Sequence, residues 1–396
     1  MDYERLYFQQ LKKRIELPRM FIQAITGPRQ VGKTTIVKQL TKQLKIPYLY
    51  VTADNVIEST NIWIEQQWET ARIKLKNSSS KEFLLIIDEI QKIKNWSETV
   101  KLLWDTDNFN ELNLKVILLG SSGLMLQQGL NESLAGRFEL IKVPHWNFNE
   151  MHDCFGFSAE QFAWFGGYPG TAPLINNEER WKDYVKNALI ESTISKDILM
   201  LTRIEKPALM RQVFEMGVSY SSKILSYNKM LGQLQDAGNT TTIAHYLRLL
   251  NTAGLLTGIP KFYTEKYREK ASTPKWQVKN TALLSALLPI NFNDVQSDFV
   301  KWGQVVESTI GAHLINMADD GNYKVFYWRH RNDEVDFVLQ KGDKIIGIEV
   351  KSGQTKATKG MGVFKSKYNP IKVLLVGITG LHWHDFLKIN PADLFD

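Results

Sequence analysis

The sequence predicts an α/β protein of several domains, and three stretches of the chain support this prediction. Residues 21–35 read as an apolar strand, a glycine loop and a helix, in that order. Residues 83–89 form a second apolar strand, which ends in two carboxylates. Residues 334–339 and 344–351 alternate charged and apolar side chains, as strands of a half-buried sheet do. With 396 residues, the chain is long enough for about two to three domains of ordinary size.

The composition excludes several classes of protein. The chain is 43% hydrophobic and 23% charged, which is typical of a well-cored protein. It has one cysteine, Cys154, so an intrachain disulfide and a cysteine zinc cage are both excluded. No leader of basic and then apolar residues is present, and apolar runs such as Phe83–Ile87 are too short to span a bilayer. We therefore expect a cytoplasmic protein without a membrane partner.

The first motif is a phosphate-binding loop between the strand Phe21–Thr26 and the helix Thr34–Leu44. It matches the pattern G-x-x-x-x-G-K-[ST], in which backbone N–H groups and a helix N-terminus face a phosphate. Lys33 can reach the β- and γ-phosphates of ATP, and the Thr34 hydroxyl can bind Mg²⁺. The alternative is a glycine turn in an ordinary α/β domain. The residues expected to bind nucleotide are Gly27, Pro28, Arg29, Gln30, Val31, Gly32, Lys33, Thr34 and Thr35.

The second motif is the strand Phe83–Glu89. An acid at the carboxyl end of such a strand lies beside the bound metal, so we expect Asp88 to bind Mg²⁺. Glu89 is then the residue that orients or deprotonates the attacking water. The alternative is a strand that ends in a solvated Asp-Glu turn.

Two further polar residues follow in the same region. The strand Leu114–Leu119 runs into Ser121, which we expect to touch the γ-phosphate or the water, while Ser122 can cap the next helix. Arg137 lies just before the strand Phe138–Val143. There it can face a nucleotide on a neighbouring subunit, which implies a homo-oligomer. The alternative is an ordinary surface arginine or one in a salt bridge.

The middle of the chain carries its whole net charge. Residues 201–290 hold twelve Lys and Arg against five Asp and Glu, a surplus equal to the +7 of the full chain. Helices over 207–217, 222–236 and 240–253, followed by a hairpin, are typical of a winged helix that binds DNA. The alternative is a structural spacer or a protein contact. The basic residues expected on the hairpin are Lys261, Lys266, Arg268, Lys270 and Lys275.

Both ends of the chain carry further predictions. Residues 1–20 look helical and basic, and we expect them to be a solvated lead-in to the first strand. Near the other end, a helix over about 299–317 carries Glu307. Asp336 and Glu349 lie on the alternating strands, where they can share a hard cation such as Mg²⁺, with Lys351 near an attacking water. The alternative is a half-buried hairpin whose charges face solvent.

The stretches GPRQVGKTT, LLIIDEIQ, LLGSS and SLAGR together resemble the prokaryotic AAA-type P-loop ATPases. FGGYPG at 165–170 is similar to a mark of one group among them, in which a winged helix and a restriction-nuclease-like domain of unknown function follow the core. Strands EVDFVL and KIIGIEVK look like the PD-(D/E)xK nuclease core, with Val335 in place of the proline.

This resemblance implies a division of the chain and a reaction. The ATPase core is expected at 1–144, a helical lid at 145–204, a winged helix at 205–290 and the nuclease-like domain at 291–396. The implied reaction is hydrolysis of ATP to ADP and phosphate, coupled to DNA binding or processing. The alternative is a nucleotide-gated regulator of DNA or protein binding whose nuclease-like domain is catalytically inert.

Overall fold

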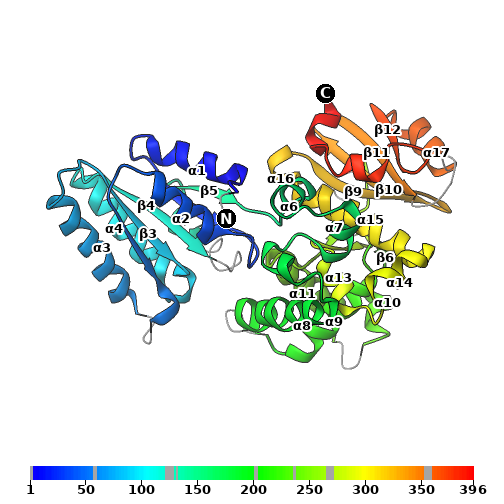
Figure 1. The fold of residues 1–396 in the computed structure, drawn as a ribbon, viewed down its shortest axis with the longest axis horizontal. Helices are drawn as coiled ribbons and strands as arrows, with labels where there is room; N and C mark the ends of the chain where they lie inside the picture. Colours follow the sequence, from blue (N-terminus) through cyan, green and yellow to red (C-terminus); the bar gives the residue numbers. More distant parts are fainter. Residues whose placement is uncertain are drawn as a thin grey trace. The chain divides into compact units, whose positions relative to one another are not determined.

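The structure is a computed structural model, and it describes residues 3–56, 60–120, 129–130, 133–199, 204–234, 238–264, 272–351 and 359–396. The chain divides into two compact units, residues 1–144 and 145–396 (Figure 1). The finer division of residues 145–396 into three domains stays a prediction. None of the helices in the described ranges combines the length and apolar character that crossing a bilayer requires.

The first unit is built on a five-stranded parallel sheet with the order β2-β3-β4-β1-β5. Its three central strands are buried along their whole length, as expected for a parallel sheet covered on both faces. The strands are β1 (Ile22–Thr26), β2 (Tyr48–Thr52), β3 (Phe83–Asp88), β4 (Leu114–Gly120) and β5 (Phe138–Lys142).

Helices cover both faces of this sheet (Figure 1). Successive strand residues point to opposite faces, so Leu84 and Ile86 belong to one core while Leu85 and Ile87 belong to the other. One face is covered by α1 (Leu6–Glu16) and α2 (Lys33–Gln43), and the other by α3 (Asn61–Lys76) and α4 (Trp96–Phe109). Short 3₁₀ turns span Ala53–Asn55 and Ile90–Lys92.

The expectation of a solvated lead-in at residues 1–20 is wrong. Helix α1 buries Tyr7, Phe8, Leu11 and Ile15 in the same core as α2. These four positions recur at the spacing of one helix face. Of the basic residues that suggested a solvated segment, Lys13 is exposed, whereas Lys12 and Arg14 are partly buried and Arg14 donates to Gln23.

The second unit begins with a helical segment. Each of its first two helices begins with a capping box. The side chains of Asn147 and Ser158 accept hydrogen bonds from the backbone N–H groups of Glu150 and Gln161, whose side chains accept in return. The elements are α6 (Phe148–Phe155), α7 (Ala159–Phe165), a 3₁₀ helix (Pro169–Leu174), α8 (Glu178–Tyr184) and two π-helical segments (Val185–Glu191 and Thr193–Leu199).

The next segment combines helices with a three-stranded antiparallel sheet of order β6-β8-β7. The first and last expected helices are confirmed as α9 and α11, and α11 buries Ile243, Leu247 and Leu250 as expected. The elements are α9 (Pro207–Ser219), β6 (Lys223–Ile224), α10 (Tyr227–Leu231), α11 (Thr240–Thr252), β7 (Leu256–Ile259) and β8 (Lys275–Val278).

The helix expected over 222–236 is wrong in its first part. Ser222 has a positive φ of 65° and donates its backbone N–H to Trp276 O at 2.7 Å, so the chain enters the sheet there as β6. Helix α10 begins only after Ser226, whose hydroxyl accepts from Lys229 N. Pairing with a strand about fifty residues away outweighs the local helical pattern.

The C-terminal segment carries a four-stranded sheet of order β12-β11-β10-β9. Strands β9, β10 and β11 are antiparallel, and β12 lies parallel to β11 after the crossover helix α17. The strands are β9 (Lys324–His330), β10 (Asp333–Lys341), β11 (Lys344–Lys351) and β12 (Lys372–Gly377). The helices are α13 (Ala282–Leu287), α14 (Phe292–Ser297), α15 (Phe299–Asn316), α16 (Ala318–Gly321), α17 (Lys359–Tyr368) and α18 (Trp383–Phe386), with a 3₁₀ helix at Pro391–Phe395.

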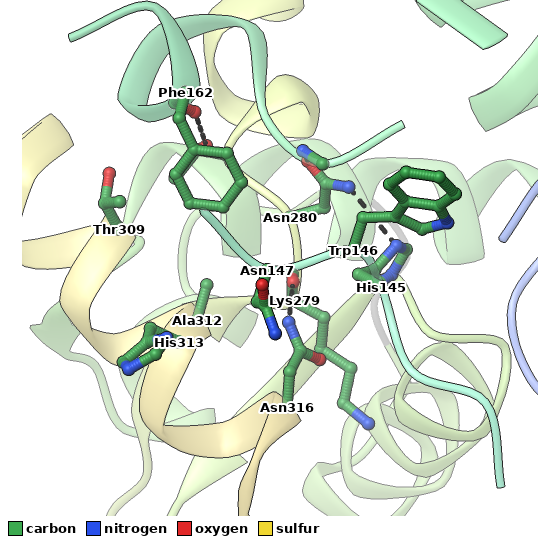
Figure 2. Close-up of a pocket in the computed structure, with 12 residues that line it drawn as sticks. His145, Trp146, Asn147, Phe162, Lys279, Asn280, Thr309, Ala312, His313 and Asn316 are labelled. Carbon is green, nitrogen blue, oxygen red and sulfur yellow. Dashed lines mark hydrogen bonds between the residues drawn. The ribbon is translucent and has the colours of Figure 1, made fainter. Parts of the chain in front are cut away.

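A buried polar network gives the FGGYPG stretch a structural role. The Asn280 carboxamide oxygen accepts from the backbone N–H groups of Gly167 and Ala282, both at 3.1 Å. Its amide donates to His145 Nδ1, and His145 Nε2 donates to the carbonyl of Gly254 at 2.7 Å. Figure 2 shows Asn280 and His145 pointing toward each other beside a cavity of about 20 Å³, which has room for about one water molecule.

Candidate functional site

The glycine loop lies at the carboxyl end of β1 and leads directly into α2. A Cβ atom at Gly27 would lie 2.1 Å from the carbonyl oxygen of Val143, so only glycine allows the loop to pass this close to the end of β5. Helix α2 begins at Lys33, and Gly32 before it offers no side-chain cap to the first N–H groups. The N-terminus of this helix, with its partial positive charge, therefore lies at the end of the loop, where an anion can bind.

Lys33 points back over the loop. Its Nζ donates to the carbonyls of Gly27 at 2.9 Å and Pro28 at 2.7 Å, and the side chain is buried. The loop is braced from the other side by Arg5, which donates to the carbonyls of Val31 and Pro144. The ammonium group is thus held inside the loop, where a phosphate would replace the two carbonyls as its partner.

The expected metal ligands Thr34 and Asp88 are in direct contact. Thr34 Oγ1 donates to Asp88 Oδ2 at 3.1 Å, although the two residues come from α2 and β3. Tyr50, at the neighbouring strand β2, donates its hydroxyl to the same carboxylate oxygen at 2.6 Å. Burial and this hydrogen bond raise the pKa of Tyr50. A hydroxyl and a carboxylate are oxygen ligands of the kind that Mg²⁺ prefers, so these residues fit that metal.

Glu89 follows Asp88 in an unusual backbone conformation. It has a φ of 55°, which is uncommon for a residue other than glycine, and its N–H donates to Asp88 Oδ1 at 2.9 Å. Its side chain accepts from Gln91 Nε2. The Glu89 backbone therefore holds the Asp88 carboxylate, and Gln91 holds the Glu89 carboxylate, at the end of β3. Strained backbone of this kind often occurs at functional sites.

Comparison with known families covers most of the chain. Residues 20–152 match the family model of an AAA domain. Residues 157–294 match a domain of unknown function (DUF8612), and residues 302–386 match another (DUF4143). No curated protein matches the chain.

The family match covers the parallel sheet that carries the glycine loop, the lysine and the two carboxylates. This match decides the class of the first unit. It contains an AAA-type P-loop ATPase domain. Solved structures that match this chain include the Walker-type ATPase of Pyrococcus abyssi, at 14% identity over 71% of this chain and 94% of that one, with a TM-score of 0.48. They also include the RuvB Holliday junction branch migration motor of Thermotoga maritima, at 14% identity over 67% of this chain and 91% of that one, with a TM-score of 0.32.

Ser121 and Arg137 were also expected to act in the ATPase domain. Ser121 lies outside the described residues, immediately after β4. Arg137 precedes β5, and its carbonyl accepts from Ile22 N at the start of β1. It therefore lies at the amino ends of the parallel strands, whereas the glycine loop lies at the carboxyl ends.

Arg137 is bound within its own chain. Its guanidinium donates to both carboxylate oxygens of Asp105, at 2.7 and 2.9 Å, and keeps 31% of its side-chain exposure. The hydrogen bonds lower the pKa of Asp105 and raise that of Arg137. A bidentate pair on the surface accounts for this arginine without a nucleotide. A role in hydrolysis would have to be on a neighbouring chain.

The four expected nuclease-like residues lie in one region, but a fifth residue is among them. Lys351 Nζ contacts Glu349 Oε1 at 2.9 Å, and Asp336 Oδ2 accepts from Val350 N at 2.8 Å. Glu307 is bound at 2.7 Å to Lys275, which comes from β8. Among the described residues, no group of three or more His, Cys, Asp or Glu side chains is placed to hold a metal ion.

The basic block is only partly a surface feature. Lys275, expected on the exposed hairpin, is completely buried, so its charge is not available to a polyanion. Lys266, Arg268 and Lys270 lie outside the described residues. Lys261 is in the described part and is half-buried. Lys275 lies on the hairpin strand β8, as expected, but the expectation that it belongs to a basic wing is wrong.

Three side chains that matter to these sites were not predicted from the sequence. The periodicity of α1 at Tyr7, Leu11 and Ile15 signals a packed helix, but no local pattern shows that Arg5 braces the glycine loop. Tyr50 is the middle residue of β2, in register with Ile86 of β3 and two residues before the end of its own strand. The rule that functional residues follow the carboxyl ends of parallel strands therefore did not single it out. The burial of Lys275 could not be predicted from the local sequence, because its partners Glu307 and Asp336 are 32 and 61 residues away.

Proposed function

We propose that this protein hydrolyses ATP to ADP and phosphate with Mg²⁺ and couples the bound nucleotide to DNA binding by residues 205–290. The observation that carries the ATPase proposal is the contact between Thr34 and Asp88, with Glu89 bonded to the same carboxylate. This contact joins the phosphate-binding loop to the strand that supplies the carboxylates.

Each residue has a separate role in this proposal. Lys33 and the loop N–H groups bind the phosphates and orient the γ-phosphoryl group, and Thr34 with Asp88 holds Mg²⁺. When bound, the metal neutralises charge on the phosphate oxygens. Glu89 accepts a hydrogen bond from the attacking water or takes its proton, and Gln91 holds the Glu89 carboxylate in place.

The arrangement of residues 207–278 supports a winged helix. A helix, a short strand, two helices and a two-stranded hairpin follow one another, and the first strand joins the hairpin in one sheet. The outer face of α11 carries Thr241, His245 and Arg248, which recur at helical spacing and are at least partly exposed. Polar side chains on one face of such a helix can contact bases or phosphates in the major groove.

DNA affinity is the test of this coupling. We expect the full chain to bind duplex DNA with an affinity that changes between ATP and ADP. Replacing Lys266, Arg268 and Lys270 with Ala should weaken binding and flatten the slope of log K against log salt by about 0.9 for each phosphate that these side chains neutralise. Fluorescence anisotropy over a range of salt concentrations measures both quantities.

The matched control removes the same charge elsewhere. Lys38, Lys42 and Lys45 are exposed in or just after α2, so their replacement with Ala also lowers the net charge by three. An equal decrease of slope in both triple variants would mean that binding follows net charge and not the basic block. Residues 205–290 would then be a protein contact or a spacer.

We also propose that Arg137 acts on the nucleotide of a neighbouring chain, since it lies at the sheet edge away from its own loop. Mixing Arg137→Ala protein with Lys33→Ala protein should restore part of the ATPase activity, because each variant supplies the residue that the other lacks. Such an arginine can contribute about 10³–10⁵-fold to the rate. Phosphate release at several protein concentrations measures the effect.

Asp105→Asn is the control for this experiment. It weakens the ion pair but keeps Arg137, so activity should persist if the arginine acts in trans. Equal losses of activity in Arg137→Ala and Asp105→Asn, with no rescue on mixing, would assign the pair a purely structural role.

The order of elements in residues 299–377 supports a nuclease-like core for the C-terminal segment. A helix, three antiparallel strands, a helix and a parallel strand follow in the order expected for the PD-(D/E)xK group. DNA cleavage by such a core would use its carboxylates. Two of these, Glu307 and Asp336, are in contact with Lys275.

A further inference from the structure

Lys275, which belongs to the three-stranded sheet, contacts one carboxylate of α15 and one of β10. Lys275 Nζ lies 2.7 Å from Glu307 Oε1, 3.1 Å from the backbone carbonyl of Asp336 and 3.6 Å from Asp336 Oδ1. The ring centroid of Phe337 lies 4.7 Å from the same nitrogen. The ammonium group therefore lies between Glu307 and Asp336, two of the four expected nuclease-like residues.

The backbone of Lys275 is fixed by the sheet to which it belongs. Lys275 is in the central strand β8, in register with Ile224 of β6 and Ile259 of β7. Its side chain has no exposed surface. The lysine has little freedom to move away from the carboxylates, because a shift of its backbone would break the ladder on both sides.

The same face of β8 makes a second polar contact with α15. Gln277, two residues along the strand, donates to the carbonyl of Ser308 at 2.8 Å and accepts from the Ser222 hydroxyl. Gln277 also packs so closely on α15 that a Cβ atom at Gly311 would lie 2.3 Å from its Oε1. Lys275 and Gln277 thus form one continuous interface between β8 and α15.

The electrostatics of the cluster agree with a permanent lysine charge. Burial alone would lower the pKa of Lys275, but the charges of Glu307 and Asp336 raise it above its ordinary value. The pKa of Lys351 shows the same balance. Burial lowers it, but the charge of Asp336 and other carboxylates outweighs burial, so the pKa is raised above its ordinary value. Two lysine charges therefore face the carboxylates of Glu307, Asp336 and Glu349, which leaves little attraction for a divalent cation.

We propose that Lys275 is the resident cation of this cluster, so that the folded chain binds no divalent metal there. The cluster instead joins β8 to α15 and β10 and makes the nuclease-like core a structural partner of the three-stranded sheet. This inference rests on the contacts of Lys275 and does not depend on ATP hydrolysis by the first unit.

Manganese binding to the full chain without nucleotide tests the proposal. Calorimetric titration should give the same isotherm for wild type and Asp336→Asn, because Mn²⁺ bound at Thr34 and Asp88 is common to both. Lys275→Ala should gain about one equivalent of bound Mn²⁺, since its carboxylates lose their cation. The double variant Lys275→Ala with Asp336→Asn should lack this equivalent, and Lys275→Arg, which keeps the charge, should not gain it.

Two results would overturn the inference. One is a manganese site in the wild-type chain that Asp336→Asn removes, and this comparison decides the matter even if Lys275→Ala does not fold. The other is a Lys275→Ala protein with the wild-type circular dichroism spectrum and no additional Mn²⁺, which would show that Nζ does not stand in the place of a metal.

Discussion

Replacing Glu89 with Gln is expected to lower the rate of ATP hydrolysis by about 10²–10⁴-fold while ATP still binds. Gln keeps the size of the side chain and its bond with Gln91, but it cannot take a proton from water. Replacing Lys33 with Ala should instead remove binding, because the loop loses the ammonium group that neutralises the phosphates. Binding of a fluorescent ATP analogue and phosphate release separate the two effects.

Glu65→Gln is the control for the removal of a carboxylate, since Glu65 is exposed on α3. It should hydrolyse ATP at the wild-type rate. If Glu89→Gln does so as well, the assignment of Glu89 to the attacking water is wrong. Thr34 and Asp88 would then remain the candidates for the metal, and another group would have to orient the water.

The second large effect is expected at Gly166, the residue that ends α7. A Cβ atom there would lie 2.0 Å from Asn280 Oδ1 and 2.6 Å from Ala282 N. Gly166→Ala therefore displaces the Asn280 side chain that binds Gly167, Ala282 and His145. Each buried N–H left without a partner costs about 1–3 kcal/mol, so the free energy of unfolding should fall by roughly 3 kcal/mol or more.

Gly156→Ala is a matched control because Gly156 also ends a helix of this unit. Its φ of 71° is close to the 70° of Gly166, but its ψ is 22°, in the left-handed region, whereas the ψ of Gly166 is −168°. A Cβ atom at Gly156 meets nothing within 4 Å. Gly156→Ala should cost only the strain of a left-handed residue, about 1–2 kcal/mol. Urea unfolding of both variants measures the difference. Equal midpoints would show that the Asn280 network adapts to the extra methyl group.

The arrangement of the candidate nucleotide site could be predicted from the sequence because its signals are local. The glycine loop follows its own strand directly, and Asp88 and Glu89 end theirs. Parallel strands then bring these ends to one edge of the sheet without further information. The contact of Thr34 with Asp88 is a consequence of this rule.

The second unit was less predictable because its decisive contacts are distant in sequence. The pattern of 222–236 suits a helix, yet β6 forms because β8 is there to pair with it. Lys275 looked like a wing residue, since a sequence pattern cannot show which partner a lysine will meet. The first unit contains one case of the same kind, because Arg137 and Asp105 are 32 residues apart and nothing in either local segment indicates their ion pair.

Helix α1 changes where the ATPase domain must be cut for expression. The family match begins at residue 20, but α1 lies before it and buries four large side chains against α2 and the sheet. Each such side chain contributes about 1.5–3 kcal/mol, so together they rival the whole stability of an ordinary domain, about 5–15 kcal/mol. A fragment that starts at residue 20 would also lose Arg5 and with it the brace of the glycine loop. A soluble fragment with an intact nucleotide site therefore has to start upstream of Arg5.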